Sequence, residues 1–369
     1  MSLALHGLGH FHPPNEITND FLEGLDIGTS DSWILERVGI RSRRTTLPLD
    51  YIRDTRNRDP RAAQEATLYT HAEAGRRAAE MAIARAGLRP DDIGMVIAGS
   101  SVGDTSTPAE ACNIARALGL EVPCLDVNSA CTSFFAHIHV LSMMREEALP
   151  PFVLLVVSEA VTRAVDYNDR PSAVLWGDGA AAAVVSTRVP GRARFLATSF
   201  ASRPSDAERV VVPRTGHFRQ DGRVVQMFAI RKTAEILGDL RAMCADGHGG
   251  SAGSEGVRAT PCAGDGDGGT RGRALASRAG HVGGGSRRLH FVGHQANLRM
   301  LEAVCREARF PEEDHHSNVE WFGNTAGAGS PSVLSMRWDE WTEDDDVAVV
   351  GVGAGLTWSG YLLRFGEAA

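Results

Sequence analysis

Short unbroken apolar runs alternate along the chain with longer stretches that have helical periodicity. Runs of four to eight apolar residues, rich in β-branched side chains, indicate buried strands. The segment LDVNSAC adds a shorter strand that rises to Cys131. The strands are therefore predicted at 1–9, 95–101, 125–131, 152–160, 180–187, 289–293 and 347–353.

Stretches with apolar residues at helical spacing lie between these strands. The helix near residue 30 has Ser30 or Asp31 as its N-cap. Gly87 ends another helix, because glycine adopts the left-handed conformation of a C-terminal cap without a steric penalty. Strands that alternate with helices favour a layered α/β fold. The helices are predicted at 30–38, 62–86, 108–118, 132–147, 225–244 and 297–308.

The two halves of the chain repeat one theme. A strand leads to Cys131 in the first half, and a strand leads to His294 in the second. We therefore expect two similar halves, residues 1–189 and 190–369, joined near residue 190.

The segment 244–288 does not fit this pattern. Gly, Ala, Ser, Asp and Arg dominate it, and it has no apolar periodicity, so it cannot bury enough surface to order itself. It is expected to be a disordered surface insertion. Two alternatives stay open: a functional lid, or a reading-frame error that replaces an ordinary helix.

Composition narrows the class of protein. With 369 residues and 43% hydrophobic side chains, the chain is long enough for two core-bearing units. A net charge of −8 gives no electrostatic reason to expect binding to nucleic acid or to an anionic membrane. No segment reads as a signal peptide or as the roughly 20 apolar residues that span a bilayer, so a cytoplasmic location is expected. The six cysteines show no C-x-x-C pair and are expected to be reduced.

Cys131 is the first candidate for chemistry. It follows a predicted strand and opens a predicted helix, where backbone N–H groups and the helix dipole would stabilise a thiolate and lower its pKa. A lone cysteine is more often a buried structural residue, so the assignment as a nucleophile depends on its partners.

His294 and Asn324 are those partners. Each follows an apolar stretch, the position at which α/β folds gather active-site residues. Singly, His294 could be a core histidine and Asn324 a turn former. Together they could donate two hydrogen bonds to a thioester oxygen and stabilise the enolate left when a malonyl group loses carbon dioxide.

These residues lie in motifs that resemble the β-ketoacyl-acyl carrier protein synthase III family, members of which extend acyl chains in fatty-acid and polyketide synthesis. The resemblance covers nearly all of the chain except 244–288 and the stretch around Leu47 to Gln64. It implies a five-layered αβαβα thiolase fold, a homodimer, and transfer from acyl-CoA to a malonyl carrier protein or malonyl-CoA without a permanently bound cofactor. The matching motifs are TSDSWILERVGIRSRR, DVNSACTSFF, LWGDGAAAAVV, GHQANLRM, GNTAGAGSP and GVGAGLTWSGYLLRF.

The resemblance also assigns roles to single residues. Cys131 would carry the acyl group, and His294 with Asn324 would bind the thioester oxygen of the extender. The backbone N–H groups of Cys131 and Ala354 would form the oxyanion hole. The remaining roles are contact with coenzyme A for Trp33, Arg37, Arg170 and Asn297, and docking of the carrier protein for Arg299. The alternative is that Trp33 belongs to the core and the arginines to a solvated surface.

Departures from the family pattern point to a specialised synthase. The family's gating phenylalanine, which enters the acyl pocket across the dimer, corresponds to Thr107, and a docking lysine corresponds to Met227. Ala354 replaces a glycine. The charged stretch 47–65 is expected to reshape the substrate entrance. We therefore expect a longer or unusual acyl chain and a role in secondary metabolism.

Two other functions stay open. The acyl-Cys131 could pass to an alcohol or amine with His294 as general base, or the chain could be a non-catalytic partner of a condensing enzyme. No metal is expected, because the histidines do not have the spacing of a zinc site and are expected on the surface. These histidines are His6, His10, His12, His315 and His316.

Overall fold

The computed structural model describes residues 3–246, 258–260 and 287–366. Most of the Gly-rich segment expected to be an insertion, a lid or an error therefore lies outside the described residues. The strands are β1 (Leu3–Phe11), β2 (Glu16–Thr18), β3 (Ser42–Arg44), β4 (Met95–Gly99), β5 (Cys124–Asp126), β6 (Val153–Glu159), β7 (Gly179–Ser186), β8 (Ala193–Ser202), β9 (Val210–Val211), β10 (Arg219–Gln220), β11 (Arg258–Thr260), β12 (Arg288–Gly293), β13 (Asp345–Gly353) and β14 (Thr357–Phe365).

The α-helices alternate with these strands, as the sequence pattern predicted. They are α1 (Asn19–Glu23), α2 (Asp31–Arg37), α3 (Leu49–Thr55), α4 (Pro60–Ala66), α5 (His71–Arg85), α6 (Glu110–Leu118), α7 (Ser133–Met143), α8 (Arg170–Ala173), α9 (Gly222–Asp246), α10 (Leu298–Ala308), α11 (Val319–Phe322) and α12 (Gly329–Met336).

The main sheet repeats one strand order twice. Its path is β12-β13-β14-β8-β1-β7-β6-β4-β5, and β11 pairs with β8. From β1 outward, β7 and β6 join antiparallel and β4 then joins parallel. From β8 outward, β14 and β13 join antiparallel and β12 then joins parallel. The same pattern of directions on either side of the β1–β8 pair gives the fold two similar halves.

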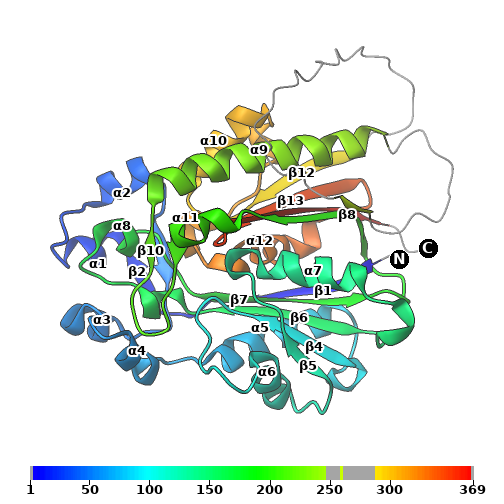
Figure 1. The fold of residues 1–369 in the computed structure, drawn as a ribbon, viewed down its shortest axis with the longest axis horizontal. Helices are drawn as coiled ribbons and strands as arrows, with labels where there is room; N and C mark the ends of the chain where they lie inside the picture. The colour runs from blue at the N-terminus through cyan, green and yellow to red at the C-terminus, as the bar shows by residue number, and fades with distance from the viewer. Residues whose placement is uncertain (1–2, 247–257, 261–286, 367–369) are drawn as a thin grey trace.

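Helices and strands stack in five layers (Figure 1). Helices α5 and α6 cover the outer face of the strands β1, β7, β6, β4 and β5, and α9 with α10 covers the outer face of β12, β13 and β14. Helices α7 and α12 lie in the middle, where each contacts strands of both halves. The layer order is therefore αβαβα.

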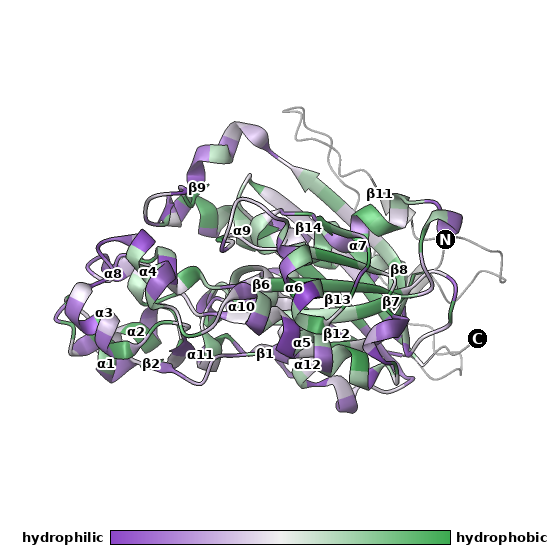
Figure 2. Cartoon of the chain, turned by 90° about the horizontal axis from the view of Figure 1, so that it is seen from below, coloured by the Kyte–Doolittle hydropathy of each residue, from purple (hydrophilic) through white to green (hydrophobic). Residues whose placement is uncertain are grey.

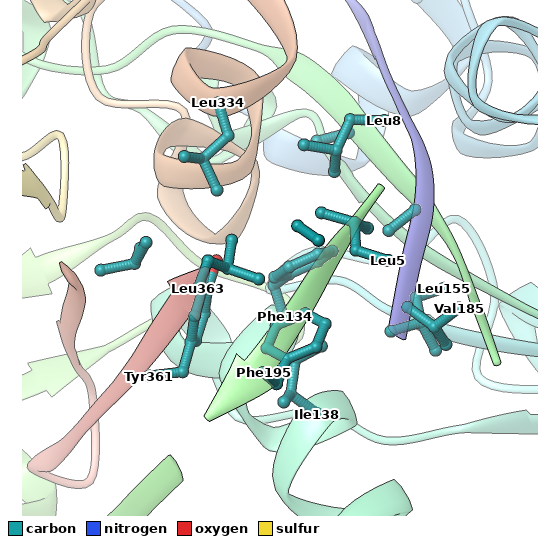
Figure 3. Packing of buried hydrophobic residues seen from close by; sticks show 14 of the residues in the cluster. Leu5, Leu8, Phe134, Ile138, Leu155, Val185, Phe195, Leu334, Tyr361 and Leu363 are labelled. Carbon is teal, nitrogen blue, oxygen red and sulfur yellow. The ribbon is translucent and has the colours of Figure 1, made fainter. Parts of the chain in front are cut away.

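The middle helices form the centre of the largest hydrophobic cluster. Phe134 and Ile138 of α7 and Leu334 of α12 pack with strand residues from both halves (Figure 3). The strands that carry these contacts are largely hydrophobic along their length, whereas outlying helices such as α3 are mixed (Figure 2). Smaller clusters fill the two outer interfaces. This packing fixes the ends of β12 and β13 close to the start of α7.

The helix predicted over 62–86 is two helices, which corrects that expectation. Helix α4 ends at Ala66, and α5 begins after Thr70, whose hydroxyl caps it by accepting the N–H of Glu73 at 3.1 Å. Helix α5 lies directly on β1: a Cβ added at Gly9 would be 1.9 Å from the backbone oxygen of Ala78. Local periodicity does not show where such a run breaks, because both pieces have helix-forming composition.

The stretch expected to reshape the entrance folds into α3 and α4. Ile52 and Ala63 are fully buried in a cluster beside the first half of the sheet. In the part of the chain that the structure describes, no helix combines the length and apolar character needed to cross a bilayer.

Candidate active site

Cys131 lies in a turn between β5 and α7. The strand predicted to reach Cys131 ends earlier, at Asp126, and a short 3-10 turn over Ala130–Thr132 precedes Ser133, the first residue of α7. Ala130 has a left-handed φ of 49°, which is costly for a residue with a side chain. The side chain of Asn128 holds this turn by accepting the N–H of Ala130 at 2.9 Å.

The expected low pKa of the Cys131 thiol is wrong. Burial, together with the nearby carboxylate of Glu159, raises the pKa of Cys131 to about 12. Removal of water raises this pKa more than the N-terminus of α7 lowers it, because desolvation disfavours the charged thiolate. Cys131 therefore rests as a neutral thiol, and a base must take its proton as it reacts.

His294 and Asn324 are both buried and lie at the ends of apolar segments. His294 follows β12 directly, and burial lowers its pKa to about 4, so the imidazole is neutral near pH 7. Asn324 follows Gly323, which has a φ of 67°. Its side-chain oxygen accepts the N–H of Ala326 at 2.9 Å, and this bond leaves the amide N–H₂ as the group that can donate to a ligand.

One cavity of about 260 Å³ brings the three residues together. Cys131, His294 and Asn324 line it, and so does Ala354, which follows β13. The chain delivers these residues from four separate positions because the ends of β12 and β13 meet the start of α7. The lining of this cavity therefore includes a thiol, a neutral imidazole and an amide donor.

Three of the four residues expected to contact coenzyme A line this cavity, and the fourth, Arg170, contacts Trp33. Trp33, Arg37 and Asn297 line the cavity. The Arg170 guanidinium lies 4.5 Å from the centre of the Trp33 ring, and its Nη1 donates to the backbone oxygen of Gly28 at 2.6 Å. The two side chains contact each other, so an adenine could enter between them only if Arg170 moves.

Asn297 and Arg299 also have structural partners. Asn297 caps α10 by accepting the N–H of Met300 at 2.8 Å. Arg299 donates to the backbone oxygen of Leu35 at 2.8 Å and pairs with Glu302 at 2.8 Å. Thr107 is exposed, and it lines neither this cavity nor the neighbouring cavities of about 420 and 490 Å³. Its expected place across a dimer stays a prediction.

The histidines expected on the surface are mostly packed, which corrects that expectation. His12 stacks on Phe322 at 3.9 Å between ring centres. His315 packs against Phe291, and Nε2 of His316 lies 2.9 Å from Nδ1 of His290. Sequence position near a terminus did not indicate burial, because β1 pairs with β7 and β8 inside the sheet.

Sequence reasoning missed Glu159, the last residue of β6. Its carboxylate accepts the N–H and the hydroxyl of Ser101 at 2.9 and 3.1 Å and the N–H of Gly327 at 3.3 Å. It therefore joins the loop after β4 to the loop that carries Asn324. The available signal was a charged residue at the end of the apolar run FVLLVVSEA.

Comparisons with known proteins agree with this arrangement. Family models described as 3-oxoacyl-[acyl-carrier-protein (ACP)] synthase III and its C terminal match residues 125–204 and 289–365. The β-ketoacyl-[acyl-carrier-protein] synthase III of Oceanobacillus iheyensis is 27% identical, with 100% of each chain covered.

Solved structures give the same result for the fold. The 3-oxoacyl-[acyl-carrier-protein] synthase III of Aquifex aeolicus VF5 superposes with a TM-score of 0.77 and 26% identity, over 98% of this chain and 100% of that one. The corresponding enzyme of Pseudomonas aeruginosa PAO1 gives 0.76 and 25%, with 100% of both chains covered. The expected five-layered thiolase fold is confirmed. The chain belongs to the β-ketoacyl-acyl carrier protein synthase III family of acyltransferases.

Proposed function

We propose that the protein transfers an acyl group to Cys131 and condenses it with a malonyl-type thioester, with loss of carbon dioxide. Family membership supports acyl-thioester condensation in general. The observation that carries the finer proposal is the single cavity that Cys131, His294 and Asn324 line together. A carboxylate in place of Asn324 would repel the enolate that this reaction forms, whereas the amide N–H₂ can donate to it.

In the first half-reaction, Cys131 attacks the carbonyl carbon of an acyl thioester. The thiol loses its proton as the sulfur–carbon bond forms, and His294 is the neutral imidazole in the lining of the same cavity that can accept it. The backbone N–H groups of Cys131 and Ala354 stabilise the oxyanion. The carbon–sulfur bond between the acyl group and the thiol of its donor then breaks, and that thiol leaves with the proton that His294 accepted.

In the second half-reaction, His294 and Asn324 each donate a hydrogen bond to the thioester oxygen of a malonyl group. The carbon–carbon bond to the carboxylate breaks, carbon dioxide leaves, and the electron pair stays on the enolate. The enolate carbon attacks the acyl carbon on Cys131. A new carbon–carbon bond forms, the sulfur–carbon bond breaks, and the departing Cys131 thiolate takes a proton from the solvent.

The remaining assignments are part of the same proposal. Coenzyme A would bind at Trp33, Arg37, Arg170 and Asn297, and an acyl carrier protein would dock near Arg299. The active form would be a cytoplasmic homodimer with no permanently bound cofactor. Residues 1–189 would form the half with the nucleophile and residues 190–369 the half with His294 and Asn324, which the repeated strand directions support.

Intact-protein mass spectrometry tests the proposal. The protein is incubated with acyl-CoAs of graded length, and malonyl-CoA or a malonyl carrier protein is then added while carbon dioxide is measured. We expect an acyl adduct that is lost with release of carbon dioxide. Cys131→Ala should form no adduct. Asn324→Asp should still form the adduct but lose carbon dioxide release by about a hundredfold or more, as for loss of an oxyanion donor.

Other outcomes would overturn the proposal. An adduct that only alcohols or amines discharge would indicate an ester- or amide-forming acyltransferase. The absence of an adduct with every acyl-CoA would indicate a non-catalytic partner. Undiminished carbon dioxide release by Asn324→Asp would remove the assigned role of Asn324.

A further inference from the structure

Cys131 also lines a second cavity, whose lining does not include Trp33. It has a volume of about 420 Å³ and is lined largely by apolar residues, among them Val161 and Phe218. A cleft of about 490 Å³ lies next to it, and Ser101, Asn128 and Val212 line both. An acyl chain that extends from Cys131 through the apolar cavity would therefore arrive at this cleft.

The cleft contains a buried carboxyl group without a partner. Glu110 lines it, is only 5% exposed, and neither of its carboxyl oxygens has a hydrogen-bond partner. Burial of a carboxyl group without a well-aligned hydrogen-bond partner is costly, because it removes water from the group. Burial, and then the charges of Asp104 and Asp126, raise the pKa of Glu110 to about 7, although the backbone of Asp104 and the positive charge of Arg163 act in the opposite direction. A positive charge beside Glu110 would remove this cost.

The neighbouring side chains indicate what kind of positive charge fits. Asp104 and Asp126 also line the cleft. Arg163 donates to Asp104 at 2.7 Å and to Nδ1 of His71 at 2.9 Å. His71, Asp104 and Glu110 offer ligand atoms within 4.8 Å of one another, but the guanidinium already occupies the side of His71 and Asp104. The guanidinium makes no hydrogen bond to Glu110, whose carboxyl group therefore suits one hydrogen-bonding cation rather than a metal ion with several ligands.

One wall of the cleft comes from the stretch that departs from the family pattern. Pro60 and Gln64 of α4 line the cleft, and the Gln64 side chain donates to the backbone oxygen of Asp104. Neither residue lines the cavity at Trp33. The added stretch therefore contributes to the wall of this cleft, and its expected effect on the substrate entrance stays a prediction.

We propose that the acyl group carried by Cys131 ends in an amine, and that Glu110 binds this ammonium group at the far end of the acyl path. The inference rests on the proposed acyl-Cys131 and specifies its substrate class. The amine donates to the Glu110 carboxylate, while the methylene chain fills the apolar cavity. A chain with a methyl end leaves Glu110 unpaired, and a chain with a carboxylate end meets like charges.

The rate of Cys131 acylation tests this substrate class. Saturated acyl-CoAs of graded length are compared at each length with an amino, a methyl or a carboxylate end, and the adduct is followed by intact-protein mass spectrometry. At the length that spans both cavities, we expect the amine to acylate about tenfold to a hundredfold faster than the methyl chain, the range of one charge-assisted hydrogen bond. The carboxylate chain should be the slowest.

Two variants identify the residue responsible. Glu110→Gln should lower the amine-to-methyl rate ratio by about tenfold or more, because the charge is lost while the size is kept. Glu121→Gln makes the same change at an exposed position outside the cleft lining and should leave the ratio unchanged. Circular dichroism melting confirms that both variants are folded.

The outcomes separate the two proposals. Adducts without any preference for the amine, or a preference that survives in Glu110→Gln, would overturn the assignment of Glu110 and leave the proposed function intact. No adduct with any chain would overturn the proposed function itself.

Discussion

Replacement of Glu159 by glutamine changes how the stability of the protein depends on pH. Glu159 is buried behind the loops that carry Cys131 and Asn324, and burial raises its pKa from an ordinary 4.5 to about 8. Between these pH values the unfolded chain has an ionised Glu159 and the folded chain a protonated one. The folded state then binds more protons, so stability falls as pH rises through this window.

The size of the effect follows from the pKa. Each pKa unit corresponds to about 1.36 kcal/mol, so the difference between 4.5 and about 8 corresponds to about 5 kcal/mol of unfolding free energy. Glutamine has no such titration. Its N–H₂ group would face the N–H donors of Ser101 or Gly327, which costs about 1–3 kcal/mol at every pH. Glu159→Gln should therefore be the less stable protein at pH 5 and the more stable one at pH 8.5.

Urea denaturation of both proteins checks this reversal. Unfolding is followed by circular dichroism from pH 5 to pH 8.5 at one protein concentration. When the two free energies of unfolding are subtracted, the contributions of the other titrating groups cancel, because both proteins share these groups. A difference that stays constant within about 1 kcal/mol over this range would refute the reasoning, because Glu159 would then titrate alike in both states.

Two further predictions concern His294 and the glycines of the fold. Burial lowers the pKa of His294 to about 4, so the rate of Cys131 acylation should stay constant from pH 8 down to about 5. The rate is measured as release of coenzyme A in a stopped-flow instrument. A rate that declines below pH 6.5 would contradict this prediction. Gly9→Ala places a Cβ 1.9 Å from a backbone oxygen of α5, whereas a Cβ at Gly238 meets nothing within 4 Å. Gly9→Ala should cost about 3 kcal/mol or more and Gly238→Ala should stabilise α9 by about 0.5–1 kcal/mol. Thermal melting measures both effects. If Gly9→Ala had the melting temperature of the unmodified protein, α5 would have to shift away from β1 without cost.

Local sequence determined the elements and their order. The all-apolar run that became β6 is buried at every position, and Ser30 caps α2 as predicted, since strand and cap signals need only a few neighbouring residues. The motifs around His294 and Asn324 placed each residue after an apolar segment, whereas the strand predicted to reach Cys131 ends at Asp126. That placement was readable because a change from apolar to polar residues marks where a buried element ends.

Tertiary structure decided the chemistry of those residues. The Cys131 thiol has a raised pKa and not the lowered one expected from its helix, because residues distant in sequence exclude water from it. Glu159 and Glu110 acquired their properties in the same way. Pro60 and Gln64 of the charged stretch 47–65 line the cleft of about 490 Å³, since the position of α4 depends on its packing against distant segments. Periodicity reports which face of an element is buried, whereas the pKa of a side chain and the shape of a cavity depend on every element that surrounds it.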